Sequence, residues 1–252
     1  MSRDSKCISC GKCALVCGQG AIAVNPGLSR SIDWDRCDQC FNFVKACTNE
    51  ALTVIGKHVT VEEVISEAER DRIFYKNSGG GVTLSGGEPL FQPDFSLKLL
   101  QAVKEKGLHT AVETSGFAQP DTLSAILPYT DLLLFDIKQL DDAKHKQYTG
   151  VGNGLILSNL RMAAGKVRTW IRIPLIAGFN DSPAEIRDIS RMARELGVEK
   201  VSLLPYHEGG VSKHAQVGKA NGPFPGKSPA DIHIADLVKL ARETGVKATV
   251  GS

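Results

Sequence analysis

From about residue 59 onward, segments with helical periodicity alternate with short apolar runs. In residues 60–75 one helical stripe gathers four apolar side chains: Val61, Val64, Ile65 and Ala68. The predicted helices cover about 60–75, 95–107, 120–129, 154–165, 182–197 and 229–245. The predicted strands cover about 79–88, 109–116, 131–138, 167–176, 201–206 and 247–251. This alternation predicts an α/β body with a parallel sheet, built either as a barrel or as a doubly wound sheet.

Polar residues follow the predicted strands at their carboxyl ends, where the chemistry of parallel sheets gathers. They are Ser85–Pro89, Glu113–Gly116, Asp136–Lys138, Arg172 and Pro205–His207. Any one of them alone is equally well explained as a solvated loop residue, but five successive strand ends predict one polar rim. The glycines at 79–81 and 86–87 would let a ligand approach the backbone closely. They match neither the dinucleotide-binding nor the P-loop pattern, so a phosphate site is not expected.

The composition is that of a globular protein with one large domain, or a small domain joined to a larger one. The chain has 252 residues, of which 42% are apolar and 23% charged, so a sizeable core is expected. No apolar run approaches the ~18 residues of a membrane span. The formal net charge of +2 argues against a nucleic-acid binder that works by bulk charge.

All seven cysteines lie between Cys7 and Cys47, and the other 205 residues contain none. An odd number cannot all form disulfides, and such clustering is typical of metal binding. The N-terminal segment MSRDSKCISC lacks the apolar run of a signal peptide. We therefore expect a reducing, cytoplasmic compartment, where cysteine clusters hold metal.

The first cysteine block has the spacing of a bacterial ferredoxin. It reads Cys7-x2-Cys10-x2-Cys13-x3-Cys17, in which three thiolates bind one iron–sulfur cube and the fourth reaches the other cube. Zinc is the alternative, but zinc sites usually pair two separated C-x2-C segments. The spacing therefore favours iron–sulfur clusters.

The second block repeats the first with one ligand replaced. It reads Cys37-x2-Cys40-x6-Cys47, and Phe43 stands where the third cysteine would be. Crossed ligation gives one cluster four ligands, listed as Cys7, Cys10, Cys13 and Cys47. The other cluster has three, listed as Cys17, Cys37 and Cys40, which leaves a three-iron cluster, a water-ligated iron or an empty site. We expect a ferredoxin-like α+β domain over residues 1–56, with half-repeats of about 1–27 and 28–56, followed by a body over 57–252.

Five segments resemble the activating enzymes of glycyl radical enzymes, a radical S-adenosylmethionine (SAM) family related to pyruvate formate-lyase activating enzyme. They are 77–95 (NSGGGVTLSGGEPLFQPDF), 109–116 (HTAVETSG), 133–141 (LLFDIKQLD), 170–181 (WIRIPLIAGFND) and 203–213 (LLPYHEGGVSK). The resemblance covers nearly the whole chain, and the head resembles an insert found in many members. It implies a partial (β/α)6 barrel, with SAM across its strand ends, in an oxidoreductase that places a radical on a partner enzyme's glycine.

The resemblance also implies roles for single residues. Backbone groups of Gly86, Gly87 and Glu88 would bind the amino group of SAM. Glu113 and Thr114 match a monovalent-cation site, although the best-known member has Asp at the first position. Other positions that would contact SAM or orient the incoming glycine loop are Asp136, Ile137, Lys138, Arg172 and His207. The implied partners are a glycyl radical enzyme and a flavodoxin or ferredoxin-type electron donor.

The chain departs from the family at its defining motif, C-x3-C-x2-C, which binds the 4Fe–4S cluster that reduces SAM. The gaps between cysteines are 2, 2, 3, 19, 2 and 6 residues, and no gap of three precedes a gap of two. In relatives the motif lies upstream of the head with the first barrel strand. We therefore expect that this part is missing, through truncation, a mis-assigned start codon or a split gene. The alternatives are an activating enzyme that is inactive in this form, or an iron–sulfur electron carrier.

Overall fold

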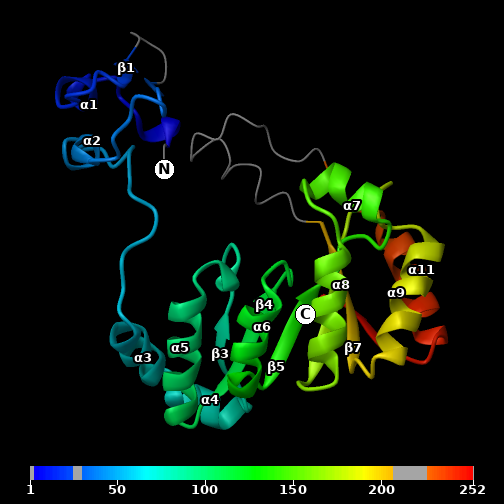
Figure 1. Cartoon of the computed structure of the whole chain (residues 1–252). Helices are drawn as coiled ribbons and strands as arrows, with labels where there is room; N and C mark the ends of the chain where they lie inside the picture. The colour runs from blue at the N-terminus through cyan, green and yellow to red at the C-terminus, as the bar shows by residue number, and fades with distance from the viewer. Residues whose placement is uncertain (1–2, 25–29, 207–225, 252) are drawn as a thin grey trace. The chain divides into compact units, whose positions relative to one another are not determined.

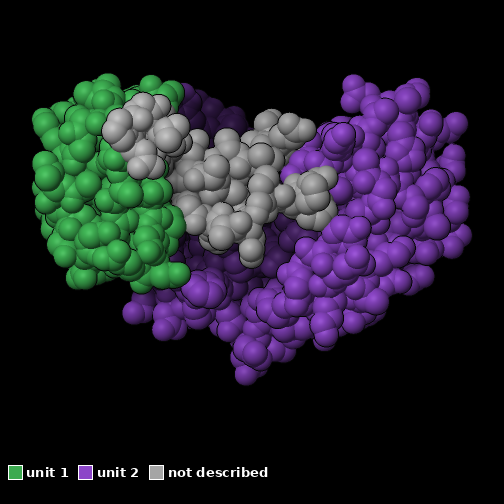
Figure 2. Space-filling view, turned by 90° about the horizontal axis from the view of Figure 1, so that it is seen from above, with its two compact units in different colours: residues 1–58, 207–225 green, residues 59–206, 226–252 purple. Residues whose placement is uncertain are grey.

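The computed structural model describes residues 3–24, 30–206 and 226–251. These residues fall into two compact units, which Figure 2 colours separately. The first unit ends at His58, and the second begins at Val59. Within the described ranges, no helix is long and apolar enough to cross a membrane.

The first unit is a small α+β head (Figure 1). Its elements are η1 (Asp4–Lys6), α1 (Lys12–Leu15), β1 (Ile22–Val24), β2 (Arg30–Ile32) and α2 (Asn42–Lys45). The two strands pair antiparallel, with Ile22 opposite Ile32. A small core joins both halves of the head through four buried side chains: Cys13, Ile22, Phe43 and Leu52.

The backbone of the head repeats with a period of 30 residues. Three cysteine pairs have this spacing: Cys7 and Cys37, Cys10 and Cys40, Cys17 and Cys47. Residues with a left-handed φ form three further pairs: Ser9 and Gln39, Gly11 and Phe41, Gly20 and Glu50. Because L side chains rarely adopt this conformation, its recurrence shows that both halves wind in the same way. Phe43 therefore occupies the place that Cys13 holds in the first half.

The second unit alternates strands and helices, as the sequence pattern predicts (Figure 1). Its strands are β3 (Gly81–Leu84), β4 (His109–Thr114), β5 (Leu132–Asp136), β6 (Thr169–Leu175), β7 (Lys200–Pro205) and β8 (Lys247–Val250). Its α-helices are α3 (Val61–Arg70), α4 (Arg72–Ser78), α5 (Pro93–Glu105), α6 (Pro120–Ile126), α7 (Asp142–Thr149), α8 (Gly154–Ala164), α9 (Pro183–Glu195) and α11 (Asp231–Glu243). Two short 3-10 helices complete it: η2 (Pro89–Phe91) and η3 (Leu127–Tyr129).

The strands form one parallel sheet in chain order, β3-β4-β5-β6-β7-β8. Since each right-handed crossover advances in the same direction, the helices come to lie on the same face of the sheet. A doubly wound sheet would instead reverse its order at a switch point. The order therefore decides between the two predicted architectures in favour of a partial barrel, which confirms the fold class.

The two faces of the sheet differ in burial. On β5, Leu133 and Phe135 are fully buried, whereas Leu132, Leu134 and Asp136 are half-buried. The same alternation runs along β6, where the half-buried side chains include Trp170 and Arg172. Helices cover the buried face, so the half-buried face is the concave inner surface of the partial barrel. That surface includes the charged side chains of Asp136 and Arg172, so it is not a purely apolar core.

Two elements differ from the sequence prediction. The helix expected over 60–75 is divided at Asp71, which ends α3 and begins α4. Helix α7 was not predicted, because its residues are almost all polar and only His145 is buried. Its N-cap Asp141 accepts a hydrogen bond from the backbone of Lys144 at 2.9 Å, so a local cap defines this helix better than an apolar stripe does.

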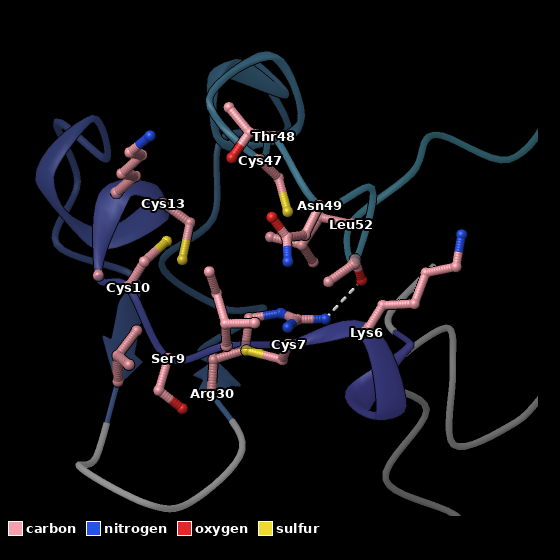
Figure 3. Close-up of a pocket in the computed structure, with 15 residues that line it drawn as sticks. Lys6, Cys7, Ser9, Cys10, Cys13, Arg30, Cys47, Thr48, Asn49 and Leu52 are labelled. Carbon is pink, nitrogen blue, oxygen red and sulfur yellow. Dashed lines mark hydrogen bonds between the residues drawn. The ribbon is translucent and has the colours of Figure 1, made fainter.

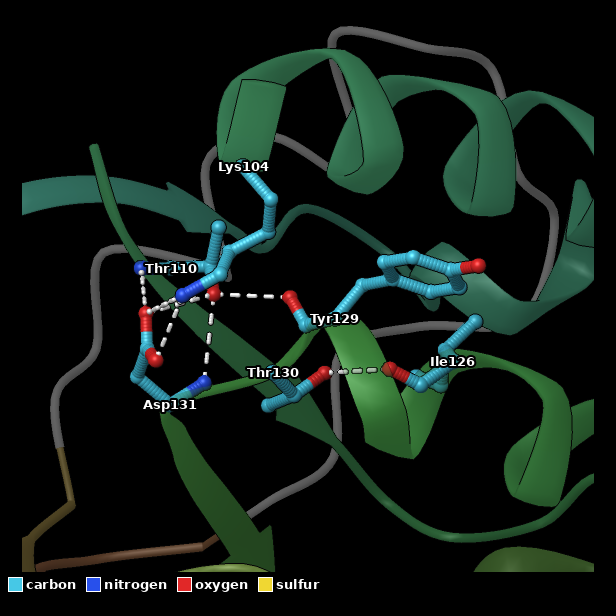
Figure 4. Close-up of polar contacts among 6 residues, drawn as sticks. All are labelled: Lys104, Thr110, Ile126, Tyr129, Thr130 and Asp131. Atoms are coloured by element: carbon cyan, nitrogen blue, oxygen red, sulfur yellow. Dashed lines mark hydrogen bonds and ion pairs between the residues drawn. The ribbon is translucent and has the colours of Figure 1, made fainter. Parts of the chain in front are cut away.

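A polar network closes the amino-terminal ends of β4 and β5 (Figure 4). Lys104 Nζ donates to both carboxylate oxygens of Asp131, at 2.7 and 2.9 Å. The backbone N–H of Thr110 donates to the same carboxylate at 2.8 Å, and the hydroxyl of Thr110 donates to the carbonyl of Tyr129 at 2.7 Å. The network lies at the opposite end of the strands from the polar rim.

Candidate functional site

Four thiols of the head surround one pocket (Figure 3). They belong to Cys7, Cys10, Cys13 and Cys47. The first three come from the loop that leads into α1 and from α1 itself, and Cys47 follows α2. Cys17 does not line this pocket, although it is nearer in sequence. The structure thus groups the four cysteines that crossed ligation predicts.

The pocket shifts the pKa values of two of its thiols in opposite directions. A hydrogen bond from the backbone of Ser9 lowers the pKa of Cys7, and Arg30 lowers it further. Burial raises the pKa of Cys13, while the nearby charge of Arg30 opposes this shift. Iron binds the thiolate form, so Cys7 is the better prepared ligand of the two.

The residues fit a 4Fe–4S cluster better than a single ion. Soft thiolates are the ligands that such clusters require, and each thiolate binds a different iron of the cube. The four sulfur atoms therefore need to surround a shared space without meeting at one point. Within the described part of the chain, no three cysteine, histidine or carboxylate side chains are placed to chelate one metal ion.

The second block presents a different environment. Phe43 is 6% exposed and packs edge-on against Phe41, with ring centroids 6.2 Å apart. The sulfur of Cys17 accepts a hydrogen bond from the backbone of Ala21 at 3.2 Å. The backbone N–H of Cys40 donates to Asp38 at 3.1 Å. A phenyl ring thus fills the position of the missing ligand and belongs to the apolar core of the head.

In the second unit, an arginine in the middle of β6 bridges the carboxyl ends of β4 and β5. Arg172 on β6 donates from Nη2 to Glu113 on β4 at 2.7 Å, and from Nε to Asp136 on β5 at 3.1 Å. The side chains of Arg172 and Asp136 are only 14% and 17% exposed. The sequence placed these three residues on one rim, and the structure brings them into direct contact.

Burial shapes the ionisation of this group. It raises the pKa of Asp136, while the charges of Arg172 and Lys138 oppose the shift. Burial alone would lower the pKa of Arg172. The hydrogen bonds to Glu113 and Asp136 and the charges of these two carboxylates have the larger effect, so the pKa of the guanidinium is raised. The arginine therefore holds a fixed positive charge between two carboxylates, with a lysine nearby.

Glu88 anchors the glycine-rich loop to the same rim. Its carboxylate accepts from the hydroxyl of Thr114 at 2.7 Å, and from the backbone and hydroxyl of Ser115 at 2.9 and 2.7 Å. Gly86 has a φ of 123°, which only glycine adopts readily, and a Cβ on Gly86 or Gly87 would meet no atom of the described residues within 4 Å. Among the described residues, nothing fills the space beside this loop backbone, as a ligand-binding loop requires.

The other predicted residues have different environments. Thr114 is buried and hydrogen-bonds to Glu88, so its hydroxyl supports the loop. The side chain of Ile137 is 1% exposed and belongs to the core, which leaves only its backbone for a ligand. Lys138 is half-buried beside Asp136, and His207 lies outside the described residues.

The expectation that the glycines at 79–81 serve a ligand needs correction. A Cβ at Gly81 would lie 1.9 Å from the carbonyl oxygen of His109, so this glycine allows β3 to pair with β4. Gly79 ends α4 with a φ of 69°. These glycines have structural roles, whereas Gly86 and Gly87 keep the open surroundings expected of a binding loop.

Sequence reasoning missed a buried amide that fixes the rim. Asn180 is fully buried and donates to the carbonyls of Lys138 and Pro174, both at 2.8 Å. Its own carbonyl accepts from the backbone of Ile176 at 2.8 Å. Asn180 therefore ties the segment after β5 to the end of β6. The only signal was its place inside the segment 170–181 that resembles the activating enzymes.

The comparisons with known proteins agree with this geometry. Residues 35–193 match the radical SAM superfamily, and residues 3–23 match a 4Fe–4S binding domain. The chain is 44% identical over 209 residues to isethionate sulfite-lyase activating enzyme of Nitratidesulfovibrio vulgaris, covering 81% of this chain and 68% of that protein. It is 35% identical over an alignment of 256 residues to indoleacetate decarboxylase activating enzyme of Tractidigestivibacter scatoligenes, covering 97% and 81%. The chain belongs to the glycyl-radical-enzyme activating family of radical SAM proteins.

A solved structure supports the same assignment. A domain of pyruvate-formate lyase-activating enzyme from Bacteroides vulgatus superposes with a TM-score of 0.58 at 32% identity, covering 69% of this chain and 99% of that domain. Activating enzymes of this family use SAM and iron–sulfur clusters to generate a glycyl radical. The family and the main function that the sequence predicted are confirmed, while the number of clusters and their ligands remain predictions.

Proposed function

We propose that the barrel of this chain binds SAM at the rim formed by Glu113, Asp136 and Arg172, in order to activate a partner glycyl radical enzyme. The observation that carries the proposal is the bridge from Arg172, in the middle of β6, to the two carboxylates at the carboxyl ends of β4 and β5. SAM carries an ammonium, a carboxylate and a sulfonium, so it suits a half-buried group of both charges. The open backbone of Gly86 and Gly87 lies in the loop that Glu88 anchors to this rim.

Each residue has a definite task in this proposal. Gly86, Gly87 and Glu88 offer backbone groups to the amino end of SAM. Asp136 and Lys138 orient the ligand and the incoming glycine loop, and Arg172 keeps the two carboxylates in place. When bound, SAM and an iron–sulfur cluster supply the radical chemistry that removes a hydrogen atom from glycine. The chain's own contribution is to position the groups and to exclude water.

The head would hold an auxiliary 4Fe–4S cluster on Cys7, Cys10, Cys13 and Cys47. Its electrons would come from a flavodoxin or ferredoxin-type donor, which fits the electron-transfer role of ferredoxin-like domains. All seven cysteines are unpaired, as expected in a reducing compartment such as the cytoplasm. The names of the relatives suggest a lyase or a decarboxylase as the glycyl radical partner.

The binding proposal is tested by titrating the purified chain with SAM and measuring the heat of binding. Asp136→Asn keeps the shape but removes the charge, and we expect it to weaken binding at least tenfold. The matched control is Asp131→Asn, which changes a carboxylate beside the other end of the same strand and should leave the affinity unchanged. Equal weakening in both variants would contradict a SAM site at the rim.

A second function is favoured by the cysteine spacing itself. Since no C-x3-C-x2-C motif occurs in the sequence, the chain could serve as an iron–sulfur electron carrier. Only the activating function requires the rim residues Glu113, Asp136 and Arg172, because electron transfer by the head does not involve SAM. An electron carrier would reduce an acceptor such as cytochrome c equally well with Arg172→Lys or Asp136→Asn, and it would show no saturable binding of SAM.

A further inference from the structure

Arg30 places a buried charge at the cysteine pocket. It begins β2, it is 7% exposed, and its Nη2 donates to the carbonyl of Ala51 at 2.6 Å. The side chain lines the same pocket as the four thiols. Figure 3 shows the guanidinium beside Cys7, held in place by its hydrogen bond to the Ala51 carbonyl. Arg30 lies outside the five segments that resemble the activating enzymes.

Other positive groups at the pocket differ from Arg30 in exposure. Lys6 and Lys12 also line it, but both are exposed to solvent. Water and salt screen the charge of an exposed lysine, whereas a buried charge acts through a medium of low polarity. Arginine also keeps its proton at every physiological pH. Arg30 is therefore the permanent, weakly screened charge at this site.

A 4Fe–4S cluster with four thiolates is anionic, and a one-electron reduction adds a further negative charge. A fixed positive charge nearby therefore stabilises the reduced cluster more than the oxidised one. Net charge and hydrogen bonding around the cluster are among the factors that set its reduction potential. The oxidised cluster takes one electron from a low-potential donor, and no bond forms or breaks in this step.

We propose that Arg30 raises the reduction potential of the cluster held by Cys7, Cys10, Cys13 and Cys47, and so makes it the electron-accepting site of the head. The inference rests on the proposed 4Fe–4S site. It assigns Arg30 a tuning role beside the ligands, because the residue itself binds no iron. The hydrogen bond to Ala51 fixes the charge at the pocket wall instead of leaving it free to turn toward solvent.

The test is a redox titration of the reconstituted full chain, followed by electron paramagnetic resonance, without SAM and without a partner enzyme. Arg30→Met removes the charge and keeps most of the volume. At a fixed potential we expect the ratio of reduced to oxidised cluster to fall at least tenfold, which is a midpoint lower by ~59 mV for a one-electron couple. Arg30→Lys should retain most of the wild-type potential. Arg36→Met, which removes an exposed arginine of the head, should change nothing.

Unchanged potentials in Arg30→Met, at wild-type iron and sulfide content, would overturn the proposal. So would an equal decrease in Arg30→Lys, because the hydrogen bond and not the charge would then be responsible. Arg30→Gln serves as a second neutral variant if Arg30→Met does not fold. If both neutral variants fail to bind iron while Arg30→Lys binds it, the charge serves cluster assembly and the tuning role is wrong. Absence of iron from the wild-type chain would instead contradict the cluster site itself.

Discussion

Phe43 and Cys13 hold the same place in the two halves of the head, yet only a thiol can bind iron. Both side chains are buried in one apolar core, with Ile22 and Leu52 beside them. The phenyl ring thus adds packing where the first half has a ligand. At the scale of single residues, we expect this one position to decide whether the second half holds a complete cluster.

Replacing this ring by a thiol should complete the second ligand set. Phe43→Cys would join Cys17, Cys37 and Cys40, so iron and labile sulfide per chain should rise after anaerobic reconstitution. The control is Phe43→Ala, which opens the same cavity without a thiol, and large-to-small changes in a core cost ~3–5 kcal/mol for Phe→Ala. Equal iron content in the two variants would show that the alignment of the two halves does not extend to their ligands.

The identity of the fourth ligand can be tested by two alanine variants. The pocket includes Cys47 and not Cys17, so Cys47→Ala should abolish the complete cluster while Cys17→Ala should leave it intact. Visible absorption and electron paramagnetic resonance of the dithionite-reduced protein report the result. The reverse outcome would mean that the first block binds its cluster with its own four cysteines.

At the scale of elements, the partial barrel separates its stabilising end from its functional end. The amino-terminal ends of β4 and β5 are joined by Lys104, Thr110 and Asp131 (Figure 4). The carboxyl ends carry Glu113 and Asp136, which Arg172 of β6 bridges. Strand β5 thus has a carboxylate beside each end, one serving stability and the other the proposed SAM site.

Removing Asp131 should weaken folding in a pH-dependent way. Burial tends to raise the pKa of Asp131, but the hydrogen bonds from Lys104 and Thr110 prevail and hold it below its usual value. This stabilisation is present above the unfolded-state pKa of about 3.9 and is lost as the pH falls through the lower folded value. Asp131→Ala should therefore cost ~1–3 kcal/mol at pH 7, because the Thr110 amide loses its acceptor.

Urea unfolding of the wild type and of Asp131→Ala at several pH values measures this difference. We expect the gap between the two proteins to shrink below about pH 4, where the Asp131 carboxylate of the unfolded chain begins to take up a proton while that of the folded protein still resists it. Glu69→Ala is a useful comparison, because it removes a half-exposed partner of Lys106 and should change stability little. A gap independent of pH would show that packing, and not the charge of Asp131, is responsible.

The sequence predicted the elements better than their arrangement. Apolar periodicity located six strands and most helices, because that pattern follows from local geometry. It could not choose between a barrel and a doubly wound sheet, since the strand order depends on tertiary pairing. It missed α7, in which only His145 is buried, and it joined α3 to α4 across Asp71.

The candidate site shows the same division. Parallel strands explain why Glu113, Asp136 and Arg172 could be assigned to one rim before their contacts were known. Arg30 and Asn180 were missed because a buried polar residue has no periodic signature in the sequence. Their roles depend on partners far along the chain, such as Ala51 for Arg30 and Lys138 for Asn180.

At the scale of the whole molecule, the head carries all seven cysteines and the barrel carries the proposed SAM site. The seven cysteines are not spaced as a C-x3-C-x2-C motif, which in the family holds the reducing cluster next to SAM. We therefore expect the reconstituted 252-residue chain, incubated with dithionite and SAM, to form no 5′-deoxyadenosine above a control without protein. A family member that carries the motif serves as the positive control. Turnover by this chain would mean that a cluster held by some of its seven cysteines reduces SAM.

The consecutive strand order also bears on how the protein is made. Each strand from β4 to β8 pairs with the strand that precedes it in the chain. A ribosome releases the segments in that sequence, so every new strand meets a partner that has already been synthesised. Pairing with the preceding strand closes a shorter loop than pairing with a distant strand would, and domains commonly fold during synthesis. The sheet can thus be extended strand by strand during translation, and no early strand has to wait for a distant partner.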